Sequence, residues 1–137
     1  MARLRSDRGL VPILLLVAGC STVTIGPPPP PPVAFRIIGE RTSSATGLRR
    51  MVVVVAPGTS RDDLDALRAY LDERHRSVSL LQITFYDEES AAQRCLDGAR
   101  PAPADGDRLL AQWLRNDATR TRWWGRPAAP GRAVETW

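Results

Sequence analysis

The sequence predicts an α+β domain whose small mixed sheet has about four strands and is built around one βαβ unit. Residues 51–56 include four consecutive valines, and β-branched side chains suit a strand that is buried on both faces. Residues 60–75 have the apolar spacing of the principal helix, and residues 78–86 alternate as a second strand does. Strand, helix and strand in this order are typical of two parallel strands joined by a crossover helix.

A single domain is expected over residues 34–127. Residues 34–38 predict a first strand, and the small, polar residues 42–47 predict a connection to the buried strand. Pro57 and Gly58 follow that strand and end it, because both residue types mark turns.

Both ends of the principal helix are signalled. Thr59 or Ser60 can accept a hydrogen bond from the first turn, and Asp62 and Asp63 complement the positive end of the helix dipole. The last turn carries cations, which are favoured at a helix carboxyl end: Arg74, His75 and Arg76. The apolar stripe that should face the sheet consists of Leu64, Leu67, Tyr70 and Leu71.

The second half of the domain is less regular. Residues 89–96 predict a short helix with Cys95 on its apolar side, which favours a buried thiol there. The alternative is an intermolecular disulfide bridge through Cys95. Residues 109–114 fit either a short helix or a strand, and residues 119–124 alternate as a strand. Residues 128–137 are expected to form a loose tail.

The first 19 residues have the layout of an export signal. Arg3, Arg5 and Arg8 precede an apolar run over residues 10–18. That run is far shorter than the ~20 residues that span a bilayer, which disfavours a transmembrane helix.

Residues 16–20, with the sequence Leu-Val-Ala-Gly-Cys, resemble the lipobox of bacterial lipoproteins. The resemblance implies a diacylglyceryl group on the Cys20 sulfur, cleavage before Cys20 and acylation of the new amine, as with palmitate. Several acyl chains anchor a protein stably. The resemblance also implies a cell-envelope location, and Ser21 implies the outer membrane, facing the periplasm, in a Gram-negative cell. The alternative is an ordinary secretory signal followed by a chance cysteine.

Residues 20–33 are predicted to tether the domain to the lipid. Residues 27–32 are an unbroken proline run, which adopts the polyproline II helix and spans about 19 Å at ~3.1 Å per residue. A ligand for a proline-recognising groove is the alternative, but Gly26 and Val33 beside the run add little specificity.

Charge and motifs exclude several classes of function. The formal net charge is +4, half of it from the first 19 residues, whereas a nucleic-acid surface needs clustered basic side chains. His75 is the only histidine, and no nucleophile elbow stands near it. Asp62, Asp63 and Asp65 lack the spacing of a calcium loop. We expect no nucleic-acid partner, no catalytic set, no cofactor and no metal.

Two groups of residues are candidates for a binding surface. The acids that follow strand 78–86 lie where α/β sheets often bind ligands. The arginines beside the paired tryptophans could hold anionic headgroups or a glycan through charge and stacking. Helix capping and core packing are the structural alternatives. The candidate surface consists of Trp123, Trp124, Arg120, Arg122, Asp87 and Glu88.

Three hypotheses for function follow. The first is a membrane-anchored envelope lipoprotein whose non-catalytic domain binds a protein or an envelope glycan, or supports an assembly. The second is a small accessory factor of a secretion or phage-derived system. The third is an envelope hydrolase that uses Asp87, Glu89 and His75.

Overall fold

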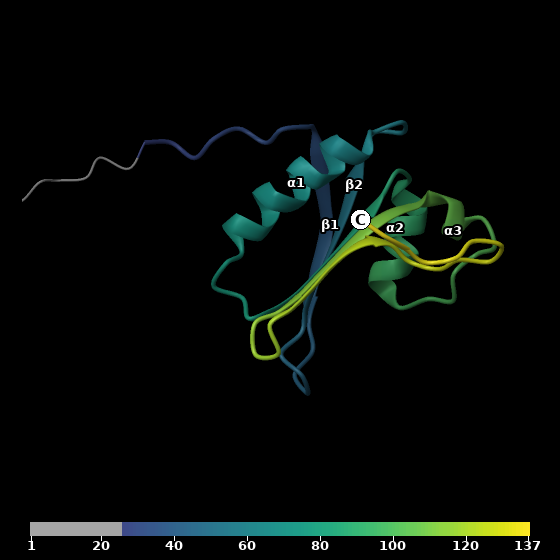
Figure 1. The fold of residues 1–137 in the computed structure, drawn as a ribbon. Coiled ribbons are helices and arrows are strands. Elements are labelled where there is room, and N and C mark those ends of the chain that lie inside the picture. Colours follow the sequence, from purple (N-terminus) through teal and green to yellow (C-terminus); the bar gives the residue numbers. More distant parts are fainter. Residues whose placement is uncertain (1–25) are drawn as a thin grey trace, which may run out of the picture.

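The computed structural model of the protein describes residues 26–137, which form six strands and three helices (Figure 1). The expected signal peptide, residues 1–19, and the expected lipidation site, Cys20, lie outside the described residues. The described part of the tether, residues 26–33, belongs to no helix or strand and runs away from the domain in Figure 1. Val33 is its first residue to pack against the core.

One open sheet contains all six strands in sequence order. They are β1 (Phe35–Thr42), β2 (Arg49–Val55), β3 (Leu80–Tyr86), β4 (Leu109–Asn116), β5 (Thr121–Arg126) and β6 (Glu135–Thr136). Strands β2 and β3 are parallel, and every other neighbouring pair is antiparallel. The mixed sheet and its βαβ unit are confirmed, but the expected number of about four strands is too small.

Helix α1 (Arg61–Arg74) is the crossover between the parallel strands and covers one face of the sheet (Figure 1). It begins where the sequence predicts, because the Ser60 side chain accepts a hydrogen bond from the Asp63 amide at 3.1 Å. Leu67 lies on the side of α1 that faces the sheet and is completely buried. The core on this face consists of Met51, Val53, Val55, Leu64, Leu67, Leu71, Leu81, Ile83, Phe85, Ala111, Trp113 and Trp124.

A buried arginine fastens the end of α1 to the sheet. The Arg115 guanidinium donates to the Asp72 carboxylate, to the His75 carbonyl at 2.8 Å and to the Val78 carbonyl. Its side chain is only 5% exposed. The last carbonyls of a helix lack partners within the helix, so Arg115 supplies the donors that they need.

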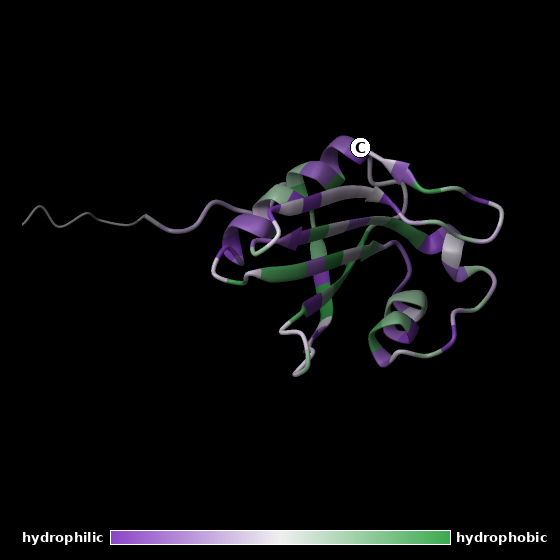
Figure 2. Ribbon diagram, turned by 60° about the horizontal axis from the view of Figure 1, so that its bottom comes forward, coloured by the Kyte–Doolittle hydropathy of each residue, from purple (hydrophilic) through white to green (hydrophobic). Residues whose placement is uncertain are grey.

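The other face of the sheet carries α2 (Glu89–Asp97) and the short α3 (Asp105–Arg108). Helix α2 packs on β1, β2 and β3 through Ala91 and Ala92. Its Leu96 lies so close to β1 that a Cβ at Gly39 would come within 2.5 Å of the Leu96 Cδ2. Figure 2 shows hydrophobic stretches of the central strands between α1 and α2.

The expectation of a loose tail over residues 128–137 is wrong at its end. Strand β6 pairs with β5, and the Trp137 ring packs against the Trp124 ring at 5.2 Å between centroids. Gly125 permits the pairing, since a Cβ there would lie 2.0 Å from the Glu135 carbonyl oxygen. A strand of two residues has no periodicity to read in a sequence.

Two further points concern the second half of the domain. Residues 109–114 form a strand and not a helix, because β3 and β5 both pair with them. The expectation of a buried Cys95 is wrong, because its side chain is exposed. Helix α2 buries Ala91 and Ala92 instead, and Leu96 closes over Gly39.

Candidate functional site

Trp123 and Trp124 do not form one surface. Neighbouring side chains of a strand point to opposite faces of the sheet. Trp124 is buried on the α1 face, where its ring lies 5.8 Å from that of Phe85. Trp123 lies beside Leu114 on the other face, and its Nε1 donates to the Thr136 hydroxyl at 3.3 Å. The prediction of a shared tryptophan surface is therefore wrong.

The predicted arginines lie at the turn between β4 and β5. Arg122 pairs with Asp117 at 2.7 Å between Nη2 and Oδ1. Arg120 is exposed and has a φ of 54°, in the left-handed region, where it helps to close the turn. The Arg122 side chain and the Arg120 backbone thus have local structural roles at the hairpin end.

The predicted acids lie at the carboxyl end of β3, but each has an arginine beside it. Arg108 contacts Glu88 at 3.1 Å and Asp87 at 3.9 Å. Glu89 pairs with Arg36 of β1. We therefore assign these acids to ion pairs that hold α2 and α3 against the sheet.

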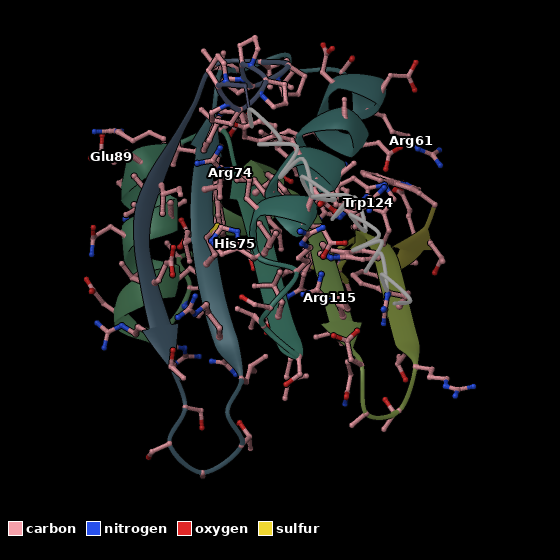
Figure 3. The ribbon with its side chains drawn as sticks, turned by 90° about the vertical axis from the view of Figure 1, so that its left-hand side faces the viewer. Arg61, Arg74, His75, Glu89, Arg115 and Trp124 are labelled. Carbon is pink, nitrogen blue, oxygen red and sulfur yellow. The ribbon has the colours of Figure 1, made fainter. Side chains whose placement is uncertain are left out.

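His75 lies at the opposite end of β3 from Asp87. Its Nδ1 lies 2.8 Å from the Leu71 carbonyl oxygen, and its Nε2 lies 3.9 Å from Glu40. The His75 carbonyl accepts from Arg115, which pairs with Leu81 near the start of β3, whereas Asp87 follows the end of β3. Figure 3 shows His75 and Glu89 well apart. The structure does not bring together the residues of the hydrolase hypothesis, and within residues 26–137 no group of three potential metal ligands is gathered.

The structure assembles a different site on the α1 face, which we call the tryptophan groove. It has a volume of about 490 Å³ and lies between α1, the interior of β4 and β5 and Trp137. Figure 3 shows Arg61 at the start of α1 and Trp124 beside that helix. The groove is lined by Arg61, Asp62, Asp65, Arg68, Trp113, Trp124 and Trp137.

Two arginines stack on the three indole rings. The Arg68 guanidinium lies 4.7 Å from the centroid of Trp113 and 5.7 Å from that of Trp124. The Arg61 guanidinium lies 4.8 Å from the centroid of Trp137. In this arrangement the flat face of each guanidinium contacts an indole ring. The guanidinium N–H groups point outward from its edge and can still donate hydrogen bonds in the plane of the group.

The charges in the tryptophan groove are balanced. Arg61 and Arg68 face Asp62 and Asp65, and Arg68 Nε donates to Asp65 Oδ1 at 2.8 Å. Arg61 forms no ion pair with the residues that the structure describes. Trp113 and Trp124 are buried, and a guanidinium lies over each of the three rings. The groove therefore offers the edges of these paired groups, with donors and acceptors, and no strong field of either sign.

Sequence reasoning identified only Trp124 among the groove residues as a candidate for binding. Trp113 lay in the segment of undecided structure, and Trp137 lay in the expected tail. One signal was available: Arg61, Asp65 and Arg68 are spaced i, i+4, i+7, which places them on one side of a helix. No sequence spacing shows that the two distant tryptophans meet there.

Comparison with known proteins adds no relative to this description. No family model matches the chain, and neither a curated protein nor a solved structure matches it.

Proposed function

We propose that this chain is an envelope lipoprotein, anchored through lipid on Cys20, whose domain is a non-catalytic module that binds a neutral, hydroxyl-rich glycan in the tryptophan groove. The observation that carries the proposal is the gathering of three indole rings with two arginines and two aspartates in one open groove. Binding sites of this kind combine flat apolar side chains with a few polar groups that fix orientation.

The groove chemistry favours a glycan over a polyanion. Because a guanidinium lies over each indole ring, a sugar would meet the edges of these paired groups, which combine apolar C–H with polar N–H atoms. Guanidinium and carboxylate groups present paired donors and paired acceptors, which suit neighbouring hydroxyls. Because the two arginines are balanced by Asp62 and Asp65, the groove gives a polyanion little electrostatic advantage.

The anchor and the tether would hold this site close to the envelope. No helix within residues 26–137 combines the length and the apolar character needed to cross a membrane. The proline run would lift the domain about 19 Å from the lipid surface, at ~3.1 Å per residue. The groove would then lie where it can bind an extended glycan next to the membrane.

Cosedimentation with insoluble chitin, a neutral polymer of β-1,4-linked N-acetylglucosamine, tests the binding. Arg61→Ala removes an exposed guanidinium from the groove without touching the buried core, and we expect at least a tenfold weaker association. Arg76→Ala is the matched control, since Arg76 is exposed beyond the other end of α1 and should change nothing. Equal binding by both variants would overturn the assignment, as would a full chain that pellets with an envelope protein but not with the glycan.

The anchor has its own test. Cells that express the chain are labelled with a palmitate analogue, and the labelled protein is compared with Cys20→Ala and Cys95→Ala. We expect the label to disappear in Cys20→Ala alone, because only that sulfur follows the lipobox-like segment. Label that persists in Cys20→Ala would refute the anchor and leave the groove to be judged on its own.

A further inference from the structure

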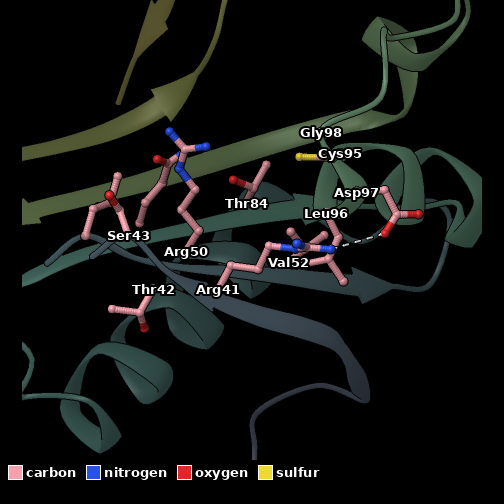
Figure 4. A pocket seen from close by; sticks show the side chains of 12 residues that line it. Arg41, Thr42, Ser43, Arg50, Val52, Thr84, Cys95, Leu96, Asp97 and Gly98 are labelled. Carbon is pink, nitrogen blue, oxygen red and sulfur yellow. Dashed lines mark ion pairs between the residues drawn. The ribbon is translucent and has the colours of Figure 1, made fainter. Parts of the chain in front are cut away.

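A second groove lies on the opposite face of the sheet, beside the carboxyl end of α2. We call it the arginine groove, and its volume is about 410 Å³ (Figure 4). Figure 4 shows Thr84 and Cys95 at its centre and Arg41 reaching toward Asp97. The polar side chains that line its floor and near rim are Arg41, Ser43, Arg50, Gln82 and Thr84.

The two arginines are direct cross-strand partners. Arg41 of β1 lies opposite Arg50 of β2 in the antiparallel register, so their side chains leave the same face of the sheet. Like charges placed opposite one another destabilise a strand pair. Gln82 of β3 is the next residue in the same row, so no acid of the neighbouring strand relieves the repulsion.

The available negative charge compensates one of the two arginines. Asp97 lies 3.5 Å from Arg41, and the carboxyl end of α2 adds a partial negative charge at the same rim. Arg50 forms no ion pair and no side-chain hydrogen bond with any residue between 26 and 137. Arg50, which is exposed, therefore adds one full positive charge to the lining of the groove.

Neutral hydrogen-bonding groups beside Arg50 are also unengaged. The Thr84 side chain is 6% exposed, and neither its hydroxyl nor the Gln82 amide forms a hydrogen bond within the described part of the chain. The Thr84 hydroxyl oxygen retains some accessible surface, and this surface opens to the groove. A polar group so placed gains most when a ligand supplies its partner.

We propose that the arginine groove binds an oxyanion, the carboxylate or phosphate group of a small ligand, with Arg50 as its principal contact. The planar guanidinium matches the oxygens of either group in a two-point contact. Thr84 and Gln82 donate to the same oxyanion. The site is independent of the tryptophan groove, which lies on the other face of the sheet.

Titration of the ¹⁵N-labelled full chain in detergent, followed by amide NMR, tests the proposal. Sodium acetate and sodium phosphate are added in separate arms against sodium chloride at constant ionic strength. We expect saturable shifts at Arg50, Gln82 and Thr84 in at least one arm, and the arm with the tighter saturation identifies the group. In Arg50→Gln the affinity should fall at least tenfold, whereas Arg76→Gln, which removes one exposed charge beyond the end of α1, should bind as the original chain does.

A melting experiment separates binding from folding. Without added anion, Arg50→Gln should melt no lower than the original chain, because it removes one member of the like-charged pair. At the same concentration, the binding anion should raise the melting temperature of the original chain more than that of Arg50→Gln. Shifts that grow linearly with concentration, or saturation of Arg50→Gln at the same concentration as the original chain, would overturn the oxyanion site.

Discussion

Replacing Arg115 by methionine tests how the helix is fastened to the sheet. Its guanidinium binds the Asp72 carboxylate and the carbonyls of His75 and Val78. Its buried Nε has no hydrogen-bond partner among the described residues and lies 3.7 Å from Asp117. Hydrogen bonds to a charged group contribute about 1.5–3 kcal/mol each, and breaking a buried pair costs about 3–5 kcal/mol. Because Asp72 is 23% exposed and keeps the Trp113 indole as donor, we place the loss near the lower end, at about 3 kcal/mol.

Urea unfolding followed by circular dichroism measures this loss. Arg122→Met is the matched control: Arg122 is the cross-strand neighbour of Arg115, but its side chain is 46% exposed and pairs with Asp117. We expect the control to lose under about 1 kcal/mol. Asp72→Asn added to Arg115→Met should cost little more, since the carboxylate has already lost its charged partner and the side-chain oxygen of the asparagine can still accept from Trp113. A loss of under about 1 kcal/mol in Arg115→Met would refute the fastening role.

Three further predictions follow from burial and charge. Leu67→Ala should cost about 2–5 kcal/mol of unfolding free energy, because Leu67 is completely buried, whereas exposed Glu73→Ala should cost under about 0.5 kcal/mol; equal urea midpoints would show that α1 packs by another face. Hydrogen bonds from Arg94 hold the pKa of Asp105 below its ordinary value, so their stabilisation is present above about pH 4 and is lost as the pH falls further. Asp105→Asn should therefore be less stable at pH 7 and lose less stability on acidification, and parallel acid titrations of the two proteins would contradict this. Cys95 should react with a neutral alkylating reagent in the folded protein as fast as in urea, because its side chain is exposed; strong protection in the folded state would contradict the placement.

The βαβ centre could be predicted because local and tertiary preferences agree there. The valine run, the Ser60 cap and the leucine stripe each specify one structure, and burial on both faces of β2 requires the same arrangement. The segment Leu109–Asn116 could not be assigned because its apolar spacing suits a helix, whereas pairing with β3 and β5 decides in favour of a strand. Pairing with strands that are separate in the sequence therefore determines the structure of this segment.

The site was less predictable than the fold for a related reason. Strand periodicity separates Trp123 from Trp124, and this consequence could have been drawn from the sequence once a strand was expected there. The meeting of Trp113, Trp124 and Trp137 could not, because it depends on β6 returning to the edge of the sheet. The absence of a side chain at Gly125 lets Glu135 of β6 approach β5 closely. The sequence does not reveal this role, because a glycine in a strand can also mark a bulge or a bend.

The indole N–H signals of the four tryptophans test the central claim most directly. The full chain is titrated with a soluble β-1,4-linked N-acetylglucosamine oligomer and followed by ¹H–¹⁵N NMR. The tryptophan groove predicts saturable shifts for Trp124 and Trp137, which line it, while Trp123 on the opposite face stays unmoved as an internal control. Shifts of Trp123 with the others, or four signals that do not move at saturating glycan, would contradict a glycan site in this groove.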